Sequence, residues 1–347
     1  MNQHEKYMQR ALDISKQGIG HTHPNPMVGC VLVYNNTIIA EGYHEQYGGA
    51  HAEVNAINNV KENINWSDVV MYVTLEPCTH YGKTPPCADM IIQKGIKHVY
   101  IATTDSNAIV KGNGIAKLKA SGAEVHVGLL EKEARSINKR FFTFHEQQRP
   151  YIVLKWAETQ DGFISKLNFN SRNENIISSD EALRMVHWWR SEEQSIMVGY
   201  RTVINDNPNL NVRLIQGKNP TKIVLDRHLD LNINKYNLFN GSETVIIYNE
   251  LKDIEDNNRI FKKISWQNKV QEICKHLYQQ KIISVLVEGG EKTLSSFITQ
   301  GLYDEVRIIK SKHKQFKEGI KAPLFSHKIP SEIINLQEDI IELYFNS

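Results

Sequence analysis

The strongest constraint on the fold is a regular alternation of short apolar runs with amphipathic segments, and the alternation occurs twice along the 347 residues. The apolar runs that predict strands in the first series are 28–34, 38–43, 69–75, 99–103 and 125–128. Helical periodicity separates or flanks them at 2–18, 51–60, 87–94, 115–120 and 130–145. Strands that alternate with helices are typical of α/β layer folds.

A second series of apolar runs begins after the polar segment Gln147–Pro150. Its predicted strands are 151–156, 196–199, 222–225, 244–248, 283–288 and 306–309. A chain of this length exceeds one average core, so we expect two domains, at 1–146 and 147–347. The Asn-rich stretch 168–175 is predicted as a loop, and the polar stretches 228–242 and 249–265 give no assignment.

Composition excludes several classes of partner. The formal net charge is +2 and there is no basic run, so nothing favours a nucleic-acid partner. No apolar stretch approaches the roughly 20 residues of a membrane span, and the polar start of the chain does not resemble a signal peptide. We therefore expect a cytoplasmic protein with no membrane partner. In that compartment its four cysteines are expected to be thiols or metal ligands.

Three residues have the types and order of a zinc site. His51, Cys78 and Cys87 supply one imidazole and two thiolates, which fill three corners of a zinc tetrahedron and leave the fourth open for water. Zinc makes that water acidic enough to attack as hydroxide. Glu53 is close enough in sequence to reach the water without binding the metal, and it is predicted to transfer the proton to the departing amine. His-x-Glu followed by Pro-Cys and a second Cys is the known signature of zinc deaminases.

Three other interpretations of these residues are open. They could be buried core residues, since buried thiols are common. They could form a structural zinc module, although such sites normally have four protein ligands. They could belong to a nucleic-acid base deaminase, although that class needs a basic face and does not account for the C-terminal 200 residues. Cys30 and Cys274 lie in apolar patterns and are expected to pack in cores, as are Trp188 and Trp189.

The spacing of the two metal-binding cysteines carries a family resemblance. Eight residues separate Cys78 from Cys87, and the segment Thr74–Cys87, read TLEPCTHYGKTPPC, resembles the zinc loop of the riboflavin-pathway pyrimidine deaminases. Pro24–Gly29 resembles their substrate loop, and the resemblance covers almost all of the first 145 residues. It implies a diaminopyrimidinone substrate that carries a ribosylamino 5′-phosphate. It also implies that Asn25 hydrogen-bonds the pyrimidine edge, although a residue between two prolines can also serve only as a turn residue. His80 is a second candidate for substrate binding, through the phosphate or the base, and its alternative is a histidine of the loop beside the metal site.

The second half has no Gly-x-Gly-x-x-Gly after a predicted strand, so a dinucleotide fold of the usual kind has no support. The motifs VLKWA, QDG, VGYRTV, DNPNLNVR and VEGG, in this order, resemble the reductase half of the bifunctional riboflavin enzymes. The resemblance implies an α/β chain in which a cytidine-deaminase-like domain is followed by a dihydrofolate-reductase-like domain. It further implies that NADPH reduces the ribosyl chain of the deaminated pyrimidine to a ribityl chain.

Residue roles in the reductase follow from the same resemblance. The positions that match the cofactor site are Ala157, Thr202, Asp206, Gly289 and Gly290. The positions that match the substrate site are Arg190, Leu210, Arg213 and Glu288. We expect Lys155 and Asp206 beside the sugar carbon that accepts hydride, and Arg190 and Arg213 beside the substrate phosphate.

Several positions depart from the family pattern. Ile176 stands where the family has an aromatic residue, Glu174 replaces a substrate-binding serine, and the basic stretch Lys310–Lys321 replaces a loop rich in Pro and Gly. These departures motivate an alternative in which the deaminase is intact and the C-terminal domain has lost reductase activity. The sequence leaves a homo-oligomer open.

Overall fold

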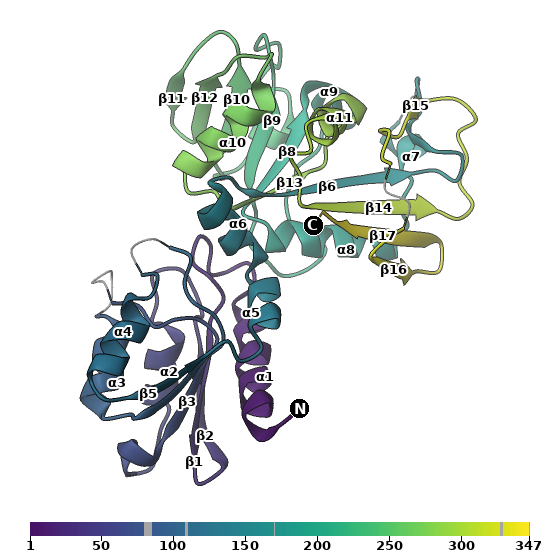
Figure 1. Cartoon of the computed structure of the whole chain (residues 1–347). Coiled ribbons are helices and arrows are strands. Elements are labelled where there is room, and N and C mark those ends of the chain that lie inside the picture. Colours follow the sequence, from purple (N-terminus) through teal and green to yellow (C-terminus); the bar gives the residue numbers. More distant parts are fainter. Residues whose placement is uncertain (80–84, 108–109, 170, 327–328, 347) are drawn as a thin grey trace. The chain divides into compact units, whose positions relative to one another are not determined.

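The computed structural model describes all residues except 80–84, 108–109, 170, 327–328 and 347 (Figure 1). The chain divides into two compact units, Met1–Gln148 and Arg149–Ser347, and each is described here by itself. No helix among the described residues is both long and apolar enough to cross a membrane.

The N-terminal unit is built on a five-stranded sheet with the order β2-β1-β3-β4-β5. The strands are β1 (Gly29–Tyr34), β2 (Thr37–Tyr43), β3 (Val70–Val73), β4 (His98–Ile101) and β5 (Glu124–Val127). β1 pairs antiparallel with both β2 and β3, whereas β3, β4 and β5 are parallel. The parallel strands end at one edge of the sheet, where ligands gather in α/β folds.

Helices cover both faces of this sheet. α1 (Gln3–Ser15) and α5 (Glu131–Ile137) pack on one face, and α2 (Ala52–Asn58), α3 (Cys87–Lys94) and α4 (Asn113–Ala120) on the other (Figure 1). α1 begins with a capping box, in which Asn2 and Glu5 exchange side-chain to backbone hydrogen bonds. The α/β expectation for the first half is confirmed.

The segment 130–145 was predicted to form one continuous helix, and this prediction was wrong. It is two helices, α5 and α6 (Lys139–Gln147), which are separated at Asn138. The Asn138 side chain accepts from the Met27 N–H and donates to the Met27 carbonyl, both at 2.8 Å. This tertiary contact to the Pro24–Gly29 loop accompanies the helix break and is invisible in helical periodicity.

The C-terminal unit contains a ten-stranded sheet with the order β11-β12-β10-β9-β8-β13-β6-β14-β17-β16. In chain order its strands are β6 (Tyr151–Glu158), β8 (Ser195–Gly199), β9 (Thr221–Leu225), β10 (Val245–Asn249), β11 (Ile254–Asp256), β12 (Arg259–Lys263), β13 (Ser284–Val287), β14 (Glu305–Ser311), β16 (Glu332–Asn335) and β17 (Asp339–Phe345). β7 (Phe163–Ser165) and β15 (Ile320–Lys321) form a separate two-stranded sheet.

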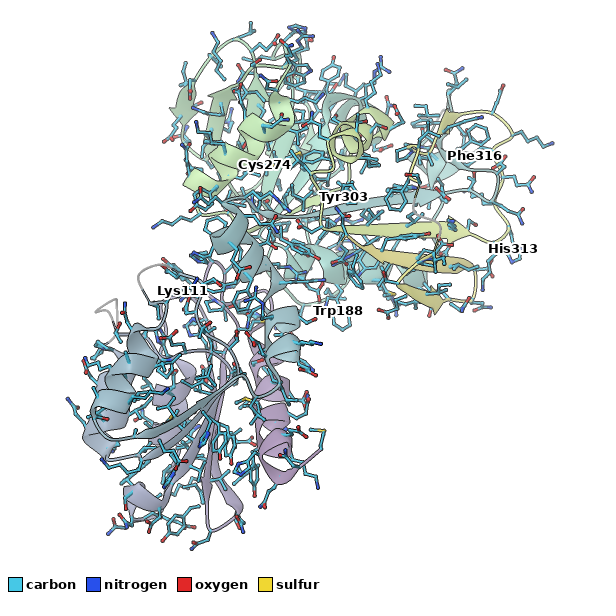
Figure 2. All side chains as sticks on the ribbon, viewed as in Figure 1. Lys111, Trp188, Cys274, Tyr303, His313 and Phe316 are labelled. Atoms are coloured by element: carbon cyan, nitrogen blue, oxygen red, sulfur yellow. The ribbon has the colours of Figure 1, made fainter. Side chains whose placement is uncertain are left out.

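Helices again cover both faces of the large sheet. α8 (Asp180–Glu192) packs on one face, and α10 (Lys269–Gln279) and α11 (Glu291–Thr299) on the other. α9 (Tyr200–Asp206) follows β8 directly. Trp189 of α8 is buried as expected, but Trp188, labelled in Figure 2, is 55% exposed because it lies on the other side of the helix. Cys30 and Cys274 are both buried, as predicted.

Parallel pairing determines where this unit can bind a ligand. β6, β13, β8 and β9 are parallel neighbours, so their carboxyl ends lie at one edge of the sheet. Two regions differ from expectation: the predicted loop at 168–175 contains a short helix, α7 (Arg172–Asn175), and the stretches without an assignment contain the short helix Asn237–Phe239 and the strands β11 and β12.

Candidate active sites

The three predicted metal ligands come together in the N-terminal unit. His51 is the N-cap of α2, Cys87 is the first residue of α3, and Cys78 lies in the loop after β3. The His51 Nδ1 atom lies 3.2 Å from the Cys87 Sγ and 3.5 Å from the Cys78 Sγ. All three donor atoms lie within 4.8 Å of one another.

This donor set fits a zinc ion. Zinc bonds of about 2.3 Å to sulfur and 2.05 Å to nitrogen at a tetrahedral angle place nitrogen and sulfur about 3.6 Å apart. The two observed separations, 3.2 and 3.5 Å, need only a small expansion to reach that value. Hydrogen bonding from Cys87, through its thiol and its backbone N–H, together with His51 lowers the pKa of Cys78 to about 4. The site is therefore already suited to a thiolate ligand.

Glu53 lies beside the ligand cluster in the first turn of α2 and is only 3% exposed. Burial raises its pKa, while the neighbouring His51 opposes that rise, and its carboxyl interacts with the Cys87 thiol. A buried carboxyl with a raised pKa, next to a metal site, is suited to accept and return a proton.

Asn25 and His44 form a chain that reaches the ligand cluster. The His44 Nδ1 atom lies 3.0 Å from the Ala50 carbonyl, which only accepts hydrogen bonds, so Nδ1 bears the proton. The His44 Nε2 atom then accepts from the Asn25 side-chain amide at 3.2 Å. The Asn25 amide oxygen is thereby left for a ligand. The edge of the His44 ring also meets the His51 ring, at 5.5 Å between centroids. The predicted substrate residue His80 lies outside the described residues.

Glu76 is a structural part of this site that the sequence analysis did not single out. Its carboxylate accepts four backbone N–H groups, from Asp105, Gly112, Gly114 and Ile115, at 2.9 to 3.2 Å. It thereby ties the start of α4 and the segment after β4 to the loop that carries Cys78. The signal in the sequence was an acidic residue next to Pro77 at the end of a buried strand, but its partners lie about 30 to 40 residues away.

In the C-terminal unit, a cavity of about 600 Å³ opens at the carboxyl edge of the sheet. This volume lies within the range of small-molecule and cofactor pockets. Eight of the ten residues predicted for the reductase site line the cavity: Lys155, Ala157, Arg190, Thr202, Asp206, Glu288, Gly289 and Gly290.

A buried charge cluster forms one end of the cavity. The Arg190 guanidinium donates two hydrogen bonds of 2.8 Å to the Glu288 carboxylate, and the Lys155 Nζ atom lies 3.8 Å from the same carboxylate. Burial alone would raise the pKa of Glu288, but Arg190 and Lys155 lower it to about 2. Burial lowers the pKa of Lys155, and Glu288 opposes that change. Three charged groups are thus held together in the wall of the cavity.

The Gly289–Gly290 turn places a helix terminus at the cavity. Gly290 is the N-cap of α11, and the first N–H groups of a helix have no partner within it, which suits an anion such as a pyrophosphate. A Cβ atom at Gly289 would come within 2.7 Å of the Thr293 Cβ, so glycine is required for the close approach of β13 and α11.

Two predicted residues lie outside the lining of the cavity. Leu210 is buried in a hydrophobic cluster, and the Arg213 backbone N–H donates to the His187 Nδ1 at 3.2 Å. Arg190 was expected beside a substrate phosphate, but here its charge is matched by Glu288. The substrate roles of Leu210 and Arg213 stay predictions.

The cavity also includes residues that the sequence analysis missed. Lys269, the first residue of α10, and Trp266, in the segment before that helix, line it. Ile176, which replaces the family's aromatic residue, lines it as well. The only sequence signal for Trp266 was a lone tryptophan next to a polar stretch without an assignment. Sheet order, which the sequence does not reveal, brings it to the same edge as Lys155 and Glu288.

Comparisons with known proteins find a different family in each half of the chain. The family described as the cytidine and deoxycytidylate deaminase zinc-binding region matches residues 1–103, and the RibD C-terminal domain matches residues 150–311. The chain is 41% identical over 310 residues to the riboflavin biosynthesis protein RibD of Aquifex aeolicus, which covers 88% of this chain and 85% of that protein. It is 39% identical to the RibD of Actinobacillus pleuropneumoniae, with coverages of 86% and 81%.

Solved structures give the same result over nearly the whole length. A Thermotoga maritima protein described as a diaminohydroxyphosphoribosylaminopyrimidine deaminase/5-amino-6-(5-phosphoribosylamino)uracil reductase is 36% identical, with a TM-score of 0.86 and 98% of each chain covered. RibD of Acinetobacter baumannii is 30% identical, with a TM-score of 0.88 and coverages of 99% and 98%. The predicted fold class, a cytidine-deaminase-like domain followed by a reductase domain, is confirmed.

Proposed function

The chain belongs to the RibD family of bifunctional riboflavin biosynthesis proteins, and we propose that it catalyses two consecutive steps on one pyrimidine. The first is hydrolytic, zinc-dependent removal of the 2-amino group from a 2,5-diamino-6-ribosylamino-pyrimidinone 5′-phosphate. The second is NADPH-dependent reduction of the ribosyl group to a ribityl chain. We assign deamination to residues 1–146 and reduction to 147–347.

The observation that carries this proposal is the presence of one suited site in each unit. The N-terminal unit brings His51, Cys78 and Cys87 together beside the buried Glu53. The C-terminal unit encloses a cofactor-sized cavity with a fixed charge cluster at one end.

In the deaminase site, His51, Cys78 and Cys87 would bind zinc, which supplies the Lewis acidity that activates a water molecule for attack on C2 of the pyrimidine. Glu53 accepts a proton from that water and returns it to the leaving amine, so that ammonia departs and a carbonyl remains. The Asn25 amide oxygen, oriented by His44, accepts a hydrogen bond from an N–H group of the pyrimidine. We also assign substrate contact to His80.

In the reductase site, NADPH supplies the hydride for the sugar carbon, and the protein supplies position and charge. The Gly289–Gly290 turn and the start of α11 would face the cofactor diphosphate, with Ala157, Thr202 and Asp206 along the same cavity. Lys155 and Asp206 are the groups that we assign to the reacting sugar carbon. Arg190, Leu210, Arg213 and Glu288 are assigned to the substrate.

The alternative of a lost reductase has no support among the described residues. The departure at Ile176 changes the cavity wall, yet the cavity and its charge cluster are present. The basic segment Lys310–Lys321 contains the last two residues of β14 and the whole of β15, and its Ile320 lines the cavity. Cytoplasmic location and a homo-oligomeric state stay predictions.

Two substitutions test the assignment of deamination to the first unit and reduction to the second. Glu53→Gln removes the proton acceptor without removing a metal ligand, so it should retain zinc and lose ammonia release by at least 100-fold. Asp206→Asn should slow NADPH oxidation with the deaminated substrate and leave ammonia release unchanged. Near-normal deamination by the Glu53 variant, or loss of both activities in the Asp206 variant, would contradict these assignments.

A further inference from the structure

The cavity of the C-terminal unit has a second end that the proposed reaction has not used. In the sheet, β9 lies on the far side of β8 from β13 and β6, and Leu225 at the end of β9 lines the cavity. Lys269, the first residue of α10, and Trp266, in the segment between β12 and α10, line the same cavity. In the sheet, β8 alone separates β9 from β13, which leads to Glu288, and β8 and β13 separate β9 from β6, which carries Lys155.

Trp266 is an aromatic surface accompanied by two cations. The Lys269 Nζ atom lies 5.8 Å from the centroid of the Trp266 ring, and the Arg227 guanidinium lies 5.9 Å from it. Trp266 is only partly buried, although a tryptophan side chain has a large apolar area to bury. A half-buried tryptophan that lines a cofactor-sized cavity offers a stacking surface for a flat heterocycle.

The two cations differ in their partners. The Arg227 guanidinium is paired with the Glu250 carboxylate at 2.7 Å, and Glu250 also accepts from the Trp266 backbone N–H at 3.1 Å. Lys269 forms no ion pair with any carboxylate of the described part of the chain. Burial and the positive charge of Arg227 both lower the pKa of Lys269. Beside its contact with the Trp266 ring, an anion placed here would give the Lys269 ammonium group an ion-pair partner.

We propose that this end binds the adenosine of the dinucleotide, with Trp266 against the adenine and Lys269 on the ribose 2′-phosphate, so that Lys269 determines the preference for NADPH over NADH. The inference rests on the proposed reductase function. The diphosphate at the start of α11 then lies between the two ends, which is the order of groups along an extended dinucleotide. Glu250 limits the preference, because it neutralises the second cation.

The test is calorimetric titration of the full chain with two nucleotides that differ only in the 2′-phosphate, adenosine 2′,5′-bisphosphate and adenosine 5′-monophosphate. The wild-type chain should bind the bisphosphate at least tenfold more tightly. Lys269→Met removes the charge, keeps an unbranched side chain of similar length and should reduce that ratio by roughly tenfold or more, the size of a charged contact. Its dissociation constant for the monophosphate should stay within about twofold of the wild type.

Three further variants make the test specific. Trp266→Leu should weaken both nucleotides equally, because stacking does not distinguish them. Glu250→Gln releases Arg227 and should raise the ratio, a gain that structural damage cannot imitate. Lys252→Met is the matched control: Lys252 lies 3.9 Å over the Phe261 ring but does not line the cavity, so both affinities should stay at the wild-type values.

The outcomes separate the inference from the proposed function. If Lys269→Met leaves the ratio unchanged, or weakens both nucleotides equally, the inference is wrong and the nicotinamide site stands. If the wild-type chain binds neither these nucleotides nor NADPH, the proposed reductase cofactor is wrong and the inference falls with it.

Discussion

Glu76→Gln is the substitution for which the structure gives the most definite expectation. The Glu76 carboxylate is 3% exposed and accepts four backbone N–H groups. Gly114 and Ile115 donate to Oε1, and Asp105 and Gly112 donate to Oε2. Glutamine has the same shape but only one side-chain oxygen, so two of these donors would face an NH₂ group, which also donates.

The expected loss of stability follows from the number of hydrogen bonds that Glu76→Gln breaks. A buried donor without an acceptor costs about 1–3 kcal/mol, and two of them cost about 2–6 kcal/mol. Movement of the segment toward water recovers part of this, so we expect the free energy of local opening to fall by about 3 kcal/mol. That change accelerates hydrogen exchange of the four amides by on the order of 100-fold, since 1.4 kcal/mol corresponds to a factor of ten.

The assay is hydrogen exchange followed by mass spectrometry on the peptides that contain these four amides. Glu62→Gln is the matched control, because Glu62 is an exposed carboxyl in the same unit. Zinc affinity should fall as well, since Glu76 is two residues from Cys78. Exchange within twofold of the wild type, or an equal acceleration in the Glu62 variant, would refute the idea that Glu76 braces the zinc loop.

Three other predictions concern the metal, the cavity and pH. Cys87→Ser should lower the zinc content of the purified protein, and an unchanged stoichiometry would remove Cys87 from the ligand set. Gly289→Ala should weaken NADPH binding and destabilise the C-terminal unit by about 1–3 kcal/mol, because its Cβ would overlap Thr293; equilibrium unfolding and a binding titration measure both effects. Burial, together with Arg190 and Arg213, lowers the pKa of His187 from 6.5 to about 4, so the unfolded chain takes up the proton first. The C-terminal unit should therefore lose roughly 1–3 kcal/mol of stability as the pH falls from about 6.5 to about 4, and His187→Gln should flatten that loss, whereas the same change at the exposed His228 should not.

The grouping of the three candidate metal ligands was predictable because it is carried by residue type and local position. His51 and Cys87 begin helices, and such starts were visible in the change from an irregular segment to helical periodicity. Few residue types bind zinc, so three of them at such positions leave few other interpretations.

The reductase cavity was predictable only in part, because most of its wall comes from the ends of strands that are distant in the chain. Most of the residues that the short motifs singled out, among them Lys155, Arg190 and Glu288, line this one cavity, while their roles stay predictions. The motifs could not reveal that Arg190 is neutralised by Glu288, which depends on the packing of α8 against the sheet. Trp266 was missed because it follows β12, and the strand order β12-β10-β9-β8-β13-β6 that connects β12 to the cavity is a tertiary property.

Local patterns failed where a tertiary contact replaced a local one. The break between α5 and α6 coincides with the paired hydrogen bonds of Asn138 to Met27, 111 residues away. The edge strand β11 and its neighbour β12 gave no apolar signal, because the β11 residues Ile254–Asp256 are all exposed and only Phe261 of β12 is buried. Strands with so little buried surface do not show the alternation on which sequence prediction depends.

The most direct test of the two-step account is to follow ammonia release and NADPH consumption together, with zinc-assayed protein and the diaminopyrimidinone ribosylamino phosphate. The account predicts both signals, with NADPH consumed only after ammonia appears. It also predicts that Glu53→Gln abolishes both from this substrate but still consumes NADPH with the deaminated compound. Ammonia release without NADPH consumption would contradict the reductase assignment, and the absence of both signals from zinc-loaded protein would contradict the assigned substrate.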